Sequence, residues 1–485
     1  MNTKQLRQKI LDLAIRGQLV PQNPDEEPAS VLLEKIRAEK ETLIKEKKIK
    51  KDKKTSYITR EEGTDKSPYP KFTEHFADGT TKEITQEIPF EIPKNWAWCR
   101  LGEIGHWAAG STPSRKKTEY YNKGSIPWLK TGDLNDGYIN NTAEFITDFA
   151  LQKCSLRLNP IGSVLIAMYG ATIGKLGILN IEATTNQACC ACVPYLGVNN
   201  KFLFFYLYTQ KRILQEKAEG GAQPNISKEK LCNFLFPLPP LAEQQRIVEK
   251  IEELLVWVEQ LEQNKTELKT YLQQTKAKVL DEAIHGKLVP QNPDDEPASV
   301  LLEKIRNEQK AIAPKNKKTL HNEHYGEELP KGWIKIQMEN ICQLSDGDKK
   351  SNTELPYLDV KFLRGKDAGK IKNSGKFIAK NTHLILVDGE NSGEIFKSEV
   401  DGYQGSTLKI LNISKEMNQE YVFYILKKEQ QLFKESKTGS AIPHLNKKLF
   451  KELPVFLPPL AEQRRIVEKI ERIFSELELI EEILE

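Results

Sequence analysis

The sequence predicts an α+β fold in which two globular α+β domains are separated by a long antiparallel two-helix coiled coil. Three observations lead to this prediction. Two blocks of residues each occur twice almost unchanged, the segments between the blocks do not resemble each other, and a heptad pattern of apolar residues follows each copy of the second block. The blocks therefore predict a shared scaffold, and the divergent segments predict two domains with different surfaces.

The first block, residues 11–37, returns as residues 280–306, a shift of 269 positions with 23 of 27 residues identical. Each copy predicts a helix that ends at a glycine, Gly17 or Gly286, with a proline shortly after it. Ser30 and Ser299 precede a Val-Leu-Leu-Glu run, and each is predicted to cap a short second helix.

The second block, residues 239–252, returns as residues 458–471, a shift of 219 positions with 13 of 14 residues identical. Apolar residues then continue at the alternating steps of four and three that are typical of a coiled-coil seam. The seam positions are Ile247, Ile251, Leu254, Val258, Leu261, Leu268, Leu272 and Val279, and in the second copy Ile466, Ile470, Ile473, Leu477, Ile480 and Leu484. A helix of about 45 residues, roughly 65 Å long, needs a partner helix to be stable.

The two ends of the chain together match one complete copy of this central helix, apart from a gap of three residues. This match predicts a pseudo-two-fold internal repeat with a circular organisation, in which the two termini meet. In such an arrangement the helices run antiparallel and hold the two domains at opposite ends of a spacer.

These patterns divide the chain into seven segments. They are N-terminal scaffold helices (1–40), a lysine-rich linker (41–91), a first globular domain (92–238), a central scaffold coiled-coil helix with a short helix (239–306), a second linker (307–328), a second globular domain (329–457) and a C-terminal scaffold helix (458–485). Within the domains, residues 162–170 and 383–388 predict strands, and residues 201–210 and 420–426 predict buried helices.

Composition narrows the function classes without choosing one. The net charge is only +4, so a basic surface for nucleic acid has to come from local clustering. No stretch approaches the roughly 20 apolar residues of a membrane helix, and seven irregularly spaced cysteines favour a reducing compartment, so we expect a cytoplasmic protein. Cys189, Cys190 and Cys192 lack a second ligand pair at finger-like spacing and are expected to be buried strand thiols.

Motifs for catalysis are not complete in this sequence. Residues 170–175 (Gly-Ala-Thr-Ile-Gly-Lys) resemble a phosphate loop, but the spacing between the glycines is one residue short, so a hairpin turn is favoured. Asp294, Glu308 and Lys310 imitate a nuclease set, yet the first repeat has Glu41 where Lys310 stands. We therefore expect no catalytic residue, metal or cofactor in this chain.

The repeated Leu-Pro-Pro-Leu-Ala-Glu-Gln-x-Arg-Ile-Val-Glu-Lys-Ile block, each time closing a divergent domain, resembles the specificity subunits of Type I restriction-modification enzymes. Residues 110–115, 126–133 and 170–175 with 186–188 also resemble the target recognition domains of that family. Residues 356–358 and 403–405 are weaker echoes in the second domain.

The resemblance implies a non-catalytic subunit that reads an asymmetric bipartite site on double-stranded DNA, one half for each domain. It also implies that two methyltransferase subunits and ATP-dependent translocase-nuclease subunits bind the scaffold. S-adenosylmethionine, ATP and Mg would then be used by those partners. The alternative is a non-enzymatic coiled-coil adaptor that binds proteins at both ends.

Side chains that make paired hydrogen bonds to bases, or that hold phosphates, are the candidates for DNA contact. They are Arg115, Lys116, Lys130, Thr131, Lys175 and Gln187 in the first domain, and Arg364, Lys366, Asn391 and Gln404 in the second. Charged residues beside the heptad seam are the candidates for partner contact. They are Arg246, Lys250, Glu253, Arg465 and Lys469.

Overall fold

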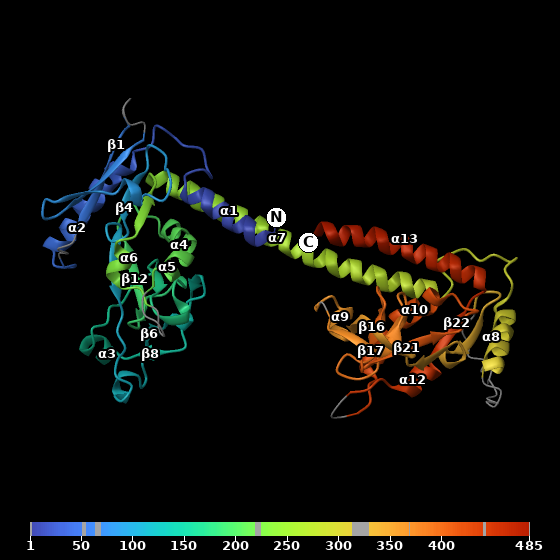
Figure 1. Cartoon of the computed structure of the whole chain (residues 1–485). Coiled ribbons are helices and arrows are strands. Elements are labelled where there is room, and N and C mark those ends of the chain that lie inside the picture. Colours follow the sequence, from blue (N-terminus) through green and yellow to red (C-terminus); the bar gives the residue numbers. More distant parts are fainter. Residues whose placement is uncertain are drawn as a thin grey trace. The chain divides into compact units, whose positions relative to one another are not determined.

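The computed structural model describes residues 2–50, 55–63, 69–218, 225–312, 329–367, 369–439 and 443–484. The chain forms two compact units, Met1–Gln263 (unit 1) and Asn264–Glu485 (unit 2). Figure 1 shows the elements of both in the order of the sequence. The boundary falls inside the 44-residue helix α7 (Leu241–Ile284), so each unit contains part of that helix. The predicted two-domain α+β fold is confirmed.

Unit 1 combines helices with several short strands. Its helices are α1 (Thr3–Ile15), α2 (Ala29–Lys45), α3 (Asp148–Lys153), α4 (Asn200–Thr209), α5 (Lys211–Glu216), α6 (Lys228–Cys232) and the first part of α7. Its strands are β1 (Ser56–Glu61), β2 (Lys71–Phe76), β3 (Thr81–Glu83), β4 (Ala97–Arg100), β5 (Gly105–Ala109), β6 (Ile126–Leu129), β7 (Gly137–Ile139), β8 (Phe145–Ile146), β9 (Val164–Ala167), β10 (Leu176–Leu179), β11 (Thr184–Thr185), β12 (Cys189–Pro194) and β13 (Leu235–Leu238).

The main sheet of unit 1 has the order β5-β12-β9-β10-β7, in which only β7 runs parallel to its neighbour. A second sheet, β11-β6-β8, lies beside it, and β4 pairs with β13. Cys189, Cys190 and Cys192 on β12 are fully buried, as the sequence predicts, and burial raises the pKa of each thiol. These thiols are core residues.

The segment predicted as a lysine-rich linker, residues 41–91, differs from that expectation. It contains the end of α2 and the antiparallel sheet β1-β2-β3. Ile58 and Phe72 of this sheet are buried in the core of unit 1, and Glu74 makes an ion pair with Arg100 of β4 at 2.5 Å. Burial of these apolar side chains stabilises a folded sheet in a segment whose many polar residues suggested a linker. Residues 51–54 and 64–68 lie outside the described residues.

Unit 2 is built in the same order on a smaller scale. Its helices are the second part of α7, α8 (Ala298–Ile312), α9 (Val360–Leu363), α10 (Gln419–Lys428), α11 (Gln430–Glu435), α12 (Lys447–Glu452) and α13 (Leu460–Leu484). Its strands are β14 (Ile334–Gln337), β15 (Cys342–Ser345), β16 (Lys349–Leu358), β17 (Ile371–Ile378), β18 (His383–Leu386), β19 (Ile395–Lys397), β20 (Gly402–Gln404), β21 (Leu408–Ile413) and β22 (Pro454–Leu457). Of the predicted second linker, residues 313–328 lie outside the described residues.

The main sheet of unit 2 has the order β15-β21-β18-β19, and β14 pairs with β22. Strands β16, β17 and β20 close into a small barrel beside this sheet. The predicted strands at residues 162–170 and 383–388 correspond to β9 and β18, and the predicted buried helices correspond to α4 and α10. Short apolar runs in the sequence were therefore sufficient to identify these elements.

Within each unit a second helix runs antiparallel to α7, as Figure 1 shows for α1 and for α13. In unit 1, Arg7 pairs with Glu262, whereas Gln22 donates to Glu243. In unit 2, Lys276 pairs with Glu481 at 2.8 Å, and Gln291, after the end of α7, donates to Glu462 at the start of α13 at 2.7 Å. Because the residue numbers of the partners move in opposite directions, the helices are antiparallel.

The predicted seam of α7 is buried toward both ends of the helix. Ile247, Ile251 and Val258 are buried in unit 1, but Leu261 is 54% exposed and Leu268 in unit 2 is 39% exposed. The apolar side chains near the middle of α7 are thus less covered than the heptad pattern predicts.

The predicted glycine stops are confirmed, because Gly17 and Gly286 both follow a helix end with φ of 69°. The predicted serine caps are wrong. Helix α2 begins at Ala29, one residue before Ser30, its N-cap is Pro28, and no side chain caps it. The Ala29 amide instead donates to the carbonyl of Asn95 at 2.9 Å, so tertiary contact satisfies an N-terminal amide that a serine would otherwise cap.

Candidate DNA interface

In unit 1 the backbone of the segment after β5 is in close contact with β11. A Cβ on Gly110 would lie 1.8 Å from the carbonyl oxygen of Thr185, so no other residue fits at this position. The amide of Ser111 donates to the same carbonyl at 2.9 Å, and the indole of Trp128 donates to the carbonyl of Ser111 at 3.1 Å. The chain that leads to Arg115 is therefore fixed on the β11-β6-β8 sheet.

Arg115 is the most firmly oriented of the predicted contact residues. Its guanidinium lies 4.4 Å from the ring centroid of Tyr121 and 5.1 Å from that of Trp128. It also makes an ion pair with Glu144, which pairs in turn with Lys130. Hydrogen bonds from Lys130 and Arg115 lower the pKa of Glu144. The Arg115 side chain is nevertheless 55% exposed, so an oriented guanidinium is available to a guanine edge or a phosphate.

Backbone pairing brings further predicted residues to the same end of the unit 1 sheets. The amide of Asn186 donates to the carbonyl of Leu129 at 2.9 Å. Because these residues directly precede Gln187 and Lys130, Gln187 lies near Lys130 and Thr131. The carbonyl of Ala188, which follows Gln187, accepts a hydrogen bond from the amide of Met168 at 2.8 Å. Met168 precedes the turn that ends at Lys175, so Lys175 lies at this end as well.

The turn between β9 and β10 is the hairpin that the sequence predicts. Gly170 and Gly174 have φ of 63° and 79°, and Gly174 donates to the carbonyl of Ala167 at 3.0 Å. Lys175 and Lys116 are exposed. The Gln187 side chain is also exposed, and its amide oxygen accepts a hydrogen bond from a threonine hydroxyl. Unit 1 therefore gathers exposed cationic and amide groups from three chain segments.

The equivalent turn in unit 2 joins β18 to β19 and carries the opposite charge. Gly389 and Gly393, 219 positions after the unit 1 glycines, have φ of 107° and 98°. Asn391 is exposed between them. Glu394 follows Gly393, at the position where unit 1 has Lys175, and its carboxylate pairs with Arg364.

The Arg364 guanidinium is therefore neutralised by Glu394, with one of its two contacts at 3.2 Å. Lys366, two residues further along, is exposed in the turn after α9. Both residues stay predictions as DNA contacts, and the acidic partner makes Arg364 the weaker one.

Gln404 does not present its amide at the surface. It is only 7% exposed, its amide nitrogen donates to Asp346 and to the carbonyl of Leu408, both at 2.7 Å, and its oxygen accepts from the amide of Gly347 at 2.8 Å. The sequence analysis named Gln404 as a candidate contact within residues 403–405, but at a shift of 219 Gln404 stands opposite Thr185, a buried strand residue.

Ser406 is the residue of unit 2 that stands opposite Gln187. It is exposed, and its amide donates to the hydroxyl of Tyr357 at 2.9 Å. The prediction of Gln404 rested on its residue type and on the weak family resemblance of residues 403–405, whereas the strand register decides which residue reaches the surface. We therefore remove Gln404 from the proposed base contacts.

Sequence reasoning also missed a group of lysines on β16 and β17. Lys349 and Lys350 on β16 and Lys372 and Lys376 on β17 are all exposed. Two short runs in the sequence, residues 349–353 and 372–376, combine lysine with serine, threonine or asparagine. That combination, repeated within one domain, was the available signal.

Two of the five predicted partner contacts are used inside their own unit. Arg246 pairs with Glu26 in unit 1, and Arg465 pairs with Asp295 in unit 2 at 2.7 Å. These pairs fasten the loop of the first repeated block to α7 and to α13. Their main role is therefore within the fold, and the prediction that they accept a partner helix loses support.

Of the other three predicted partner residues, Glu253 is exposed and Lys250 is half-buried. Lys250 pairs with Glu253 on the same helix at 2.9 Å and lies over the ring of Trp257, which is 56% exposed. Lys469 on α13 is exposed.

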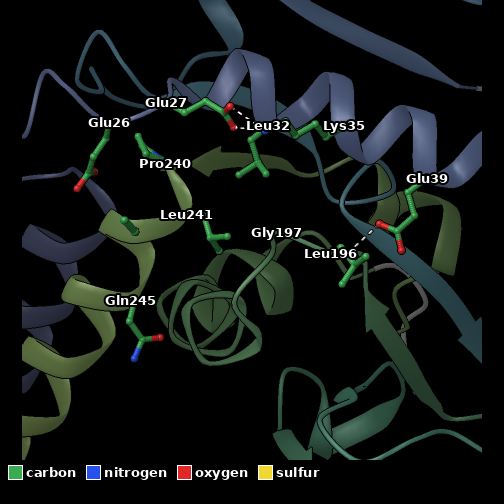
Figure 2. Close-up of a pocket in the computed structure, with 11 residues that line it drawn as sticks. Glu26, Glu27, Leu32, Lys35, Glu39, Leu196, Gly197, Pro240, Leu241 and Gln245 are labelled. Carbon is green, nitrogen blue, oxygen red and sulfur yellow. Dashed lines mark hydrogen bonds and ion pairs between the residues drawn. The ribbon is translucent and has the colours of Figure 1, made fainter.

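A groove of about 710 Å³ opens in unit 1 between α2, the loop before α4 and the start of α7 (Figure 2). Leu196 and Leu241 line it and are 79% and 51% exposed. Glu26, Glu27 and Glu39 also line the groove, but Glu26 pairs with Arg246, Glu27 pairs with Lys35, and Glu39 accepts a hydrogen bond from the amide of Leu196. None of the predicted DNA-contact residues lines this groove.

The structure was also searched for a metal-binding cluster and for a membrane-spanning helix. Within the described ranges no three His, Cys, Asp or Glu side chains come together as a metal site. In the same part of the chain, none of the helices combines the length and the apolar character needed to cross a membrane.

Comparison with known proteins identifies the class. The family model described as Type I restriction modification DNA specificity domain matches residues 93–270 and 330–485. The chain is 24% identical over 453 residues to the Type I restriction enzyme EcoAI specificity subunit of Escherichia coli, covering 80% of this chain and 70% of that subunit. It is 28% identical over 286 residues to the MjaIX specificity subunit of Methanocaldococcus jannaschii, covering 56% of this chain and 59% of that subunit.

A solved structure shows the same fold. The HsdS subunit from Thermoanaerobacter tengcongensis superposes with a TM-score of 0.54 at 20% identity, covering 83% of this chain and 94% of that one. The class is thus that of DNA sequence-recognition subunits rather than enzymes. Because the family model covers more than half of the sequence, the chain belongs to the Type I restriction modification DNA specificity domain family.

Proposed function

We propose that this chain reads an asymmetric DNA site of two separated halves, unit 1 binding one half and unit 2 the other. One observation carries the proposal. The two units share a frame, but the offset between them falls from 237 residues at Pro93 and Pro330 to 219 at Val164 and His383. The segment before β18 is therefore 18 residues shorter than that before β9, and unequal surfaces imply unequal half-sites.

In this proposal the DNA contacts of unit 1 come from one end of its sheets. They are Arg115, Lys116, Lys130, Thr131, Lys175 and Gln187. In unit 2 they include Arg364, Lys366 and Asn391. Arginine and glutamine have the geometry for paired hydrogen bonds to guanine and adenine, whereas lysine and threonine are suited to phosphates.

The helices serve as the spacer between the half-sites. We propose that α7 forms an antiparallel two-helix coiled coil with α1 and α13, and that the pseudo-two-fold repeat has a circular organisation. The antiparallel pairing within each unit and the repeated blocks support this arrangement. The spacing between the two DNA halves would then follow from the length of the helices.

We further propose that two methyltransferase subunits and the translocase-nuclease restriction subunits assemble on the scaffold. Lys250, Glu253 and Lys469 are the proposed contact residues. S-adenosylmethionine, ATP and Mg would be used by those partners, and this chain would supply sequence recognition and positioning.

The decisive experiment is to co-express the chain with its methyltransferase subunit and to map methylated adenines across the host DNA by single-molecule sequencing. We expect one bipartite motif. Replacing residues 92–238 with the corresponding domain of a relative should change one half of the motif and leave the other. Complex formation without any motif would favour the adaptor function instead.

Two point variants sharpen this test. Lys175→Ala should weaken binding to all sequences, because a phosphate contact carries no base information. Gln187→Ala should change the preference at one base pair. Equal effects of both variants on every sequence would contradict this division of roles.

A further inference from the structure

In unit 2, strands β16 and β17 form an antiparallel ribbon with a bulge. Their register pairs Ser351 with Ser374, is then interrupted, and resumes where Leu355 faces Lys372. Three residues of β16 therefore lie opposite the single residue Asn373. The first four residues of each strand are exposed. The ribbon thus presents both strands and its bulge at the surface.

The ribbon is held in one shape by Tyr403 of β20. Tyr403 is fully buried and pairs with Tyr357 of β16 and with Phe377 of β17, which closes the small barrel. Its hydroxyl donates to the carbonyl of Thr353 in the bulge at 2.7 Å. A Cβ on Gly375 would lie 2.9 Å from the Tyr403 ring, so glycine lets the strand curve around it. The bulge is therefore fixed from within.

The exposed surface of the ribbon is basic. The two strands carry Lys349, Lys350, Lys372 and Lys376 and one acid, Glu354. Lys376 pairs with an aspartate at 3.0 Å, whereas among the described residues no carboxylate pairs with the other three lysines. The net charge of the strands is thus about +3, on a chain whose net charge is only +4.

Two of these lysines are oriented by aromatic rings. The ammonium of Lys350 lies 4.2 Å from the ring centroid of Phe377, and that of Lys372 lies 3.4 Å from that of Tyr357. Unit 1 holds Arg115 over two rings in the same manner. Seating a cation on a ring limits its rotamers, and so reduces the entropy lost when it binds a phosphate.

Between the lysines the ribbon offers short hydrogen-bonding side chains. Asn352 begins the bulge with φ of 64°, and Asn373 is the residue that faces the bulge from β17. The DNA major groove admits a two-stranded ribbon, and asparagine makes paired hydrogen bonds to adenine there. Lysines on both strands would meet the phosphates at the two edges of the groove.

We propose that the β16–β17 ribbon is the part of unit 2 that enters the major groove. Lys349, Lys350 and Lys372 hold phosphates, and Asn352 and Asn373 read base edges. This inference rests on the proposed function and adds the ribbon residues to Arg364, Lys366 and Asn391 as contacts with the second half-site.

The test uses the full chain and a DNA duplex that carries the mapped motif. Binding is measured by fluorescence anisotropy over a series of salt concentrations. Lys350→Ala and Lys372→Ala should each weaken binding to all sequences and reduce the slope of log Kd against log salt by about 1. Lys350→Arg should retain the slope. Lys447→Ala, an exposed lysine of α12, is the matched control and should change neither quantity.

Asn373→Ala should raise Kd about 5- to 150-fold on the motif and remove the preference at one base pair of the unit 2 half-site. The preference at the unit 1 half-site should not change, and thermal unfolding of the variant should match that of the parent chain. Unchanged affinity and preference in Asn373→Ala, together with unchanged salt slopes in both lysine variants, would overturn the inference. The domain exchange at residues 92–238 tests the proposed function separately, because it does not involve the ribbon.

Discussion

Unit 1 and unit 2 repeat two hydrogen bonds made by their shared blocks. Gln22 donates to Glu243 in unit 1 at 2.5 Å, and Gln291 donates to Glu462 in unit 2 at 2.7 Å. In unit 1 the amide of Asn199 donates to the side chain of Gln244 in α7 at 2.7 Å. In unit 2 the amide of Asn418 donates to the side chain of Gln463 in α13 at 3.0 Å. Repetition of these contacts explains why the blocks scarcely differ in sequence.

The surfaces beyond these contacts differ in chemistry. Unit 1 presents an arginine stacked on two aromatic rings, whereas unit 2 presents a lysine-bearing ribbon. At the end of the equivalent hairpin turn, unit 1 has Lys175 and unit 2 has Glu394. The difference teaches that one frame can carry unrelated recognition surfaces, because the frame contacts lie at the scaffold end.

The largest expected difference in stability between the two units arises at a buried carboxylate of unit 1. Arg37 in unit 1 pairs at 2.7 Å with Glu103, which is only 7% exposed. Unit 2 has Arg306 and Asn340 at these positions, and among the described residues Nε of Arg306 has no hydrogen-bond partner. Arg37→Ala should destabilise unit 1 by about 3 to 5 kcal/mol, because an unpaired charge remains buried. Arg306→Ala should cost unit 2 about 1 kcal/mol.

Hydrogen-deuterium exchange with mass spectrometry reports on each unit separately and measures both losses. Burial raises the pKa of Glu103 even with Arg37 beside it. A carboxyl with a raised pKa adds stability at low pH and loses that contribution as pH rises through its pKa. The loss in Arg37→Ala should therefore shrink between pH 7 and pH 5. Equal losses in the two units would refute this account.

The second prediction concerns a feature that both units share. A Cβ on Gly17 would lie 2.5 Å from the ring of Pro93, and one on Gly286 would lie 2.6 Å from that of Pro330. Gly17→Ala and Gly286→Ala should each destabilise their own unit by about 2 to 4 kcal/mol, from crowding and positive φ together. Gly79 has φ of 85° and open space around it, so Gly79→Ala is a control for backbone strain without crowding. Its loss of unfolding free energy, measured by urea unfolding, should be smaller.

A third prediction concerns a polar group that only unit 2 contains. Glu420 contacts Lys397 at 2.6 Å and His383 at 3.2 Å, whereas unit 1 has Ile178 and Val164 in place of those two residues. Burial raises the pKa of Glu420, but hydrogen bonds from His383 and Lys397 outweigh it and lower the pKa to about 2.

A carboxylate with a lowered pKa contributes stability above about pH 4.5 and loses it as pH falls toward 2. Unit 2 should therefore lose at most about 3 kcal/mol over that range from this group. Glu420→Gln should flatten this part of the profile in unit 2 and leave unit 1 unchanged. An unaltered acid profile in the variant would count against the assignment.

The smallest expected effect comes from a surface ion pair that both units repeat. Lys35 pairs with Glu27, and Lys304 pairs with Glu296, each at 2.7 Å. Exposed pairs of this kind contribute little, so Lys35→Ala and Lys304→Ala should each shift the Tm by less than about 2 °C. A clearly larger shift in one unit, measured by differential scanning calorimetry, would reveal an environment that the two copies do not share.

The sequence alone determined the repeat, the two-domain α+β fold, the family and the glycine stops. These follow from identities between distant blocks and from local periodicity, both of which are visible in one dimension. The sequence also predicted Arg115, Lys130, Lys175 and Gln187 as candidate DNA contacts, and the structure brings these four residues to one end of the unit 1 sheets.

Only the tertiary structure decided which polar residues are exposed. Gln404 is buried and Ser406 is exposed because strand register, rather than neighbouring letters, sets the facing of a side chain. Arg246 and Arg465 are held by acids of a distant loop, and the ribbon lysines are gathered by pairing of strands that α9 separates. Such facts depend on contacts between residues far apart in the chain, and local sequence patterns do not encode them.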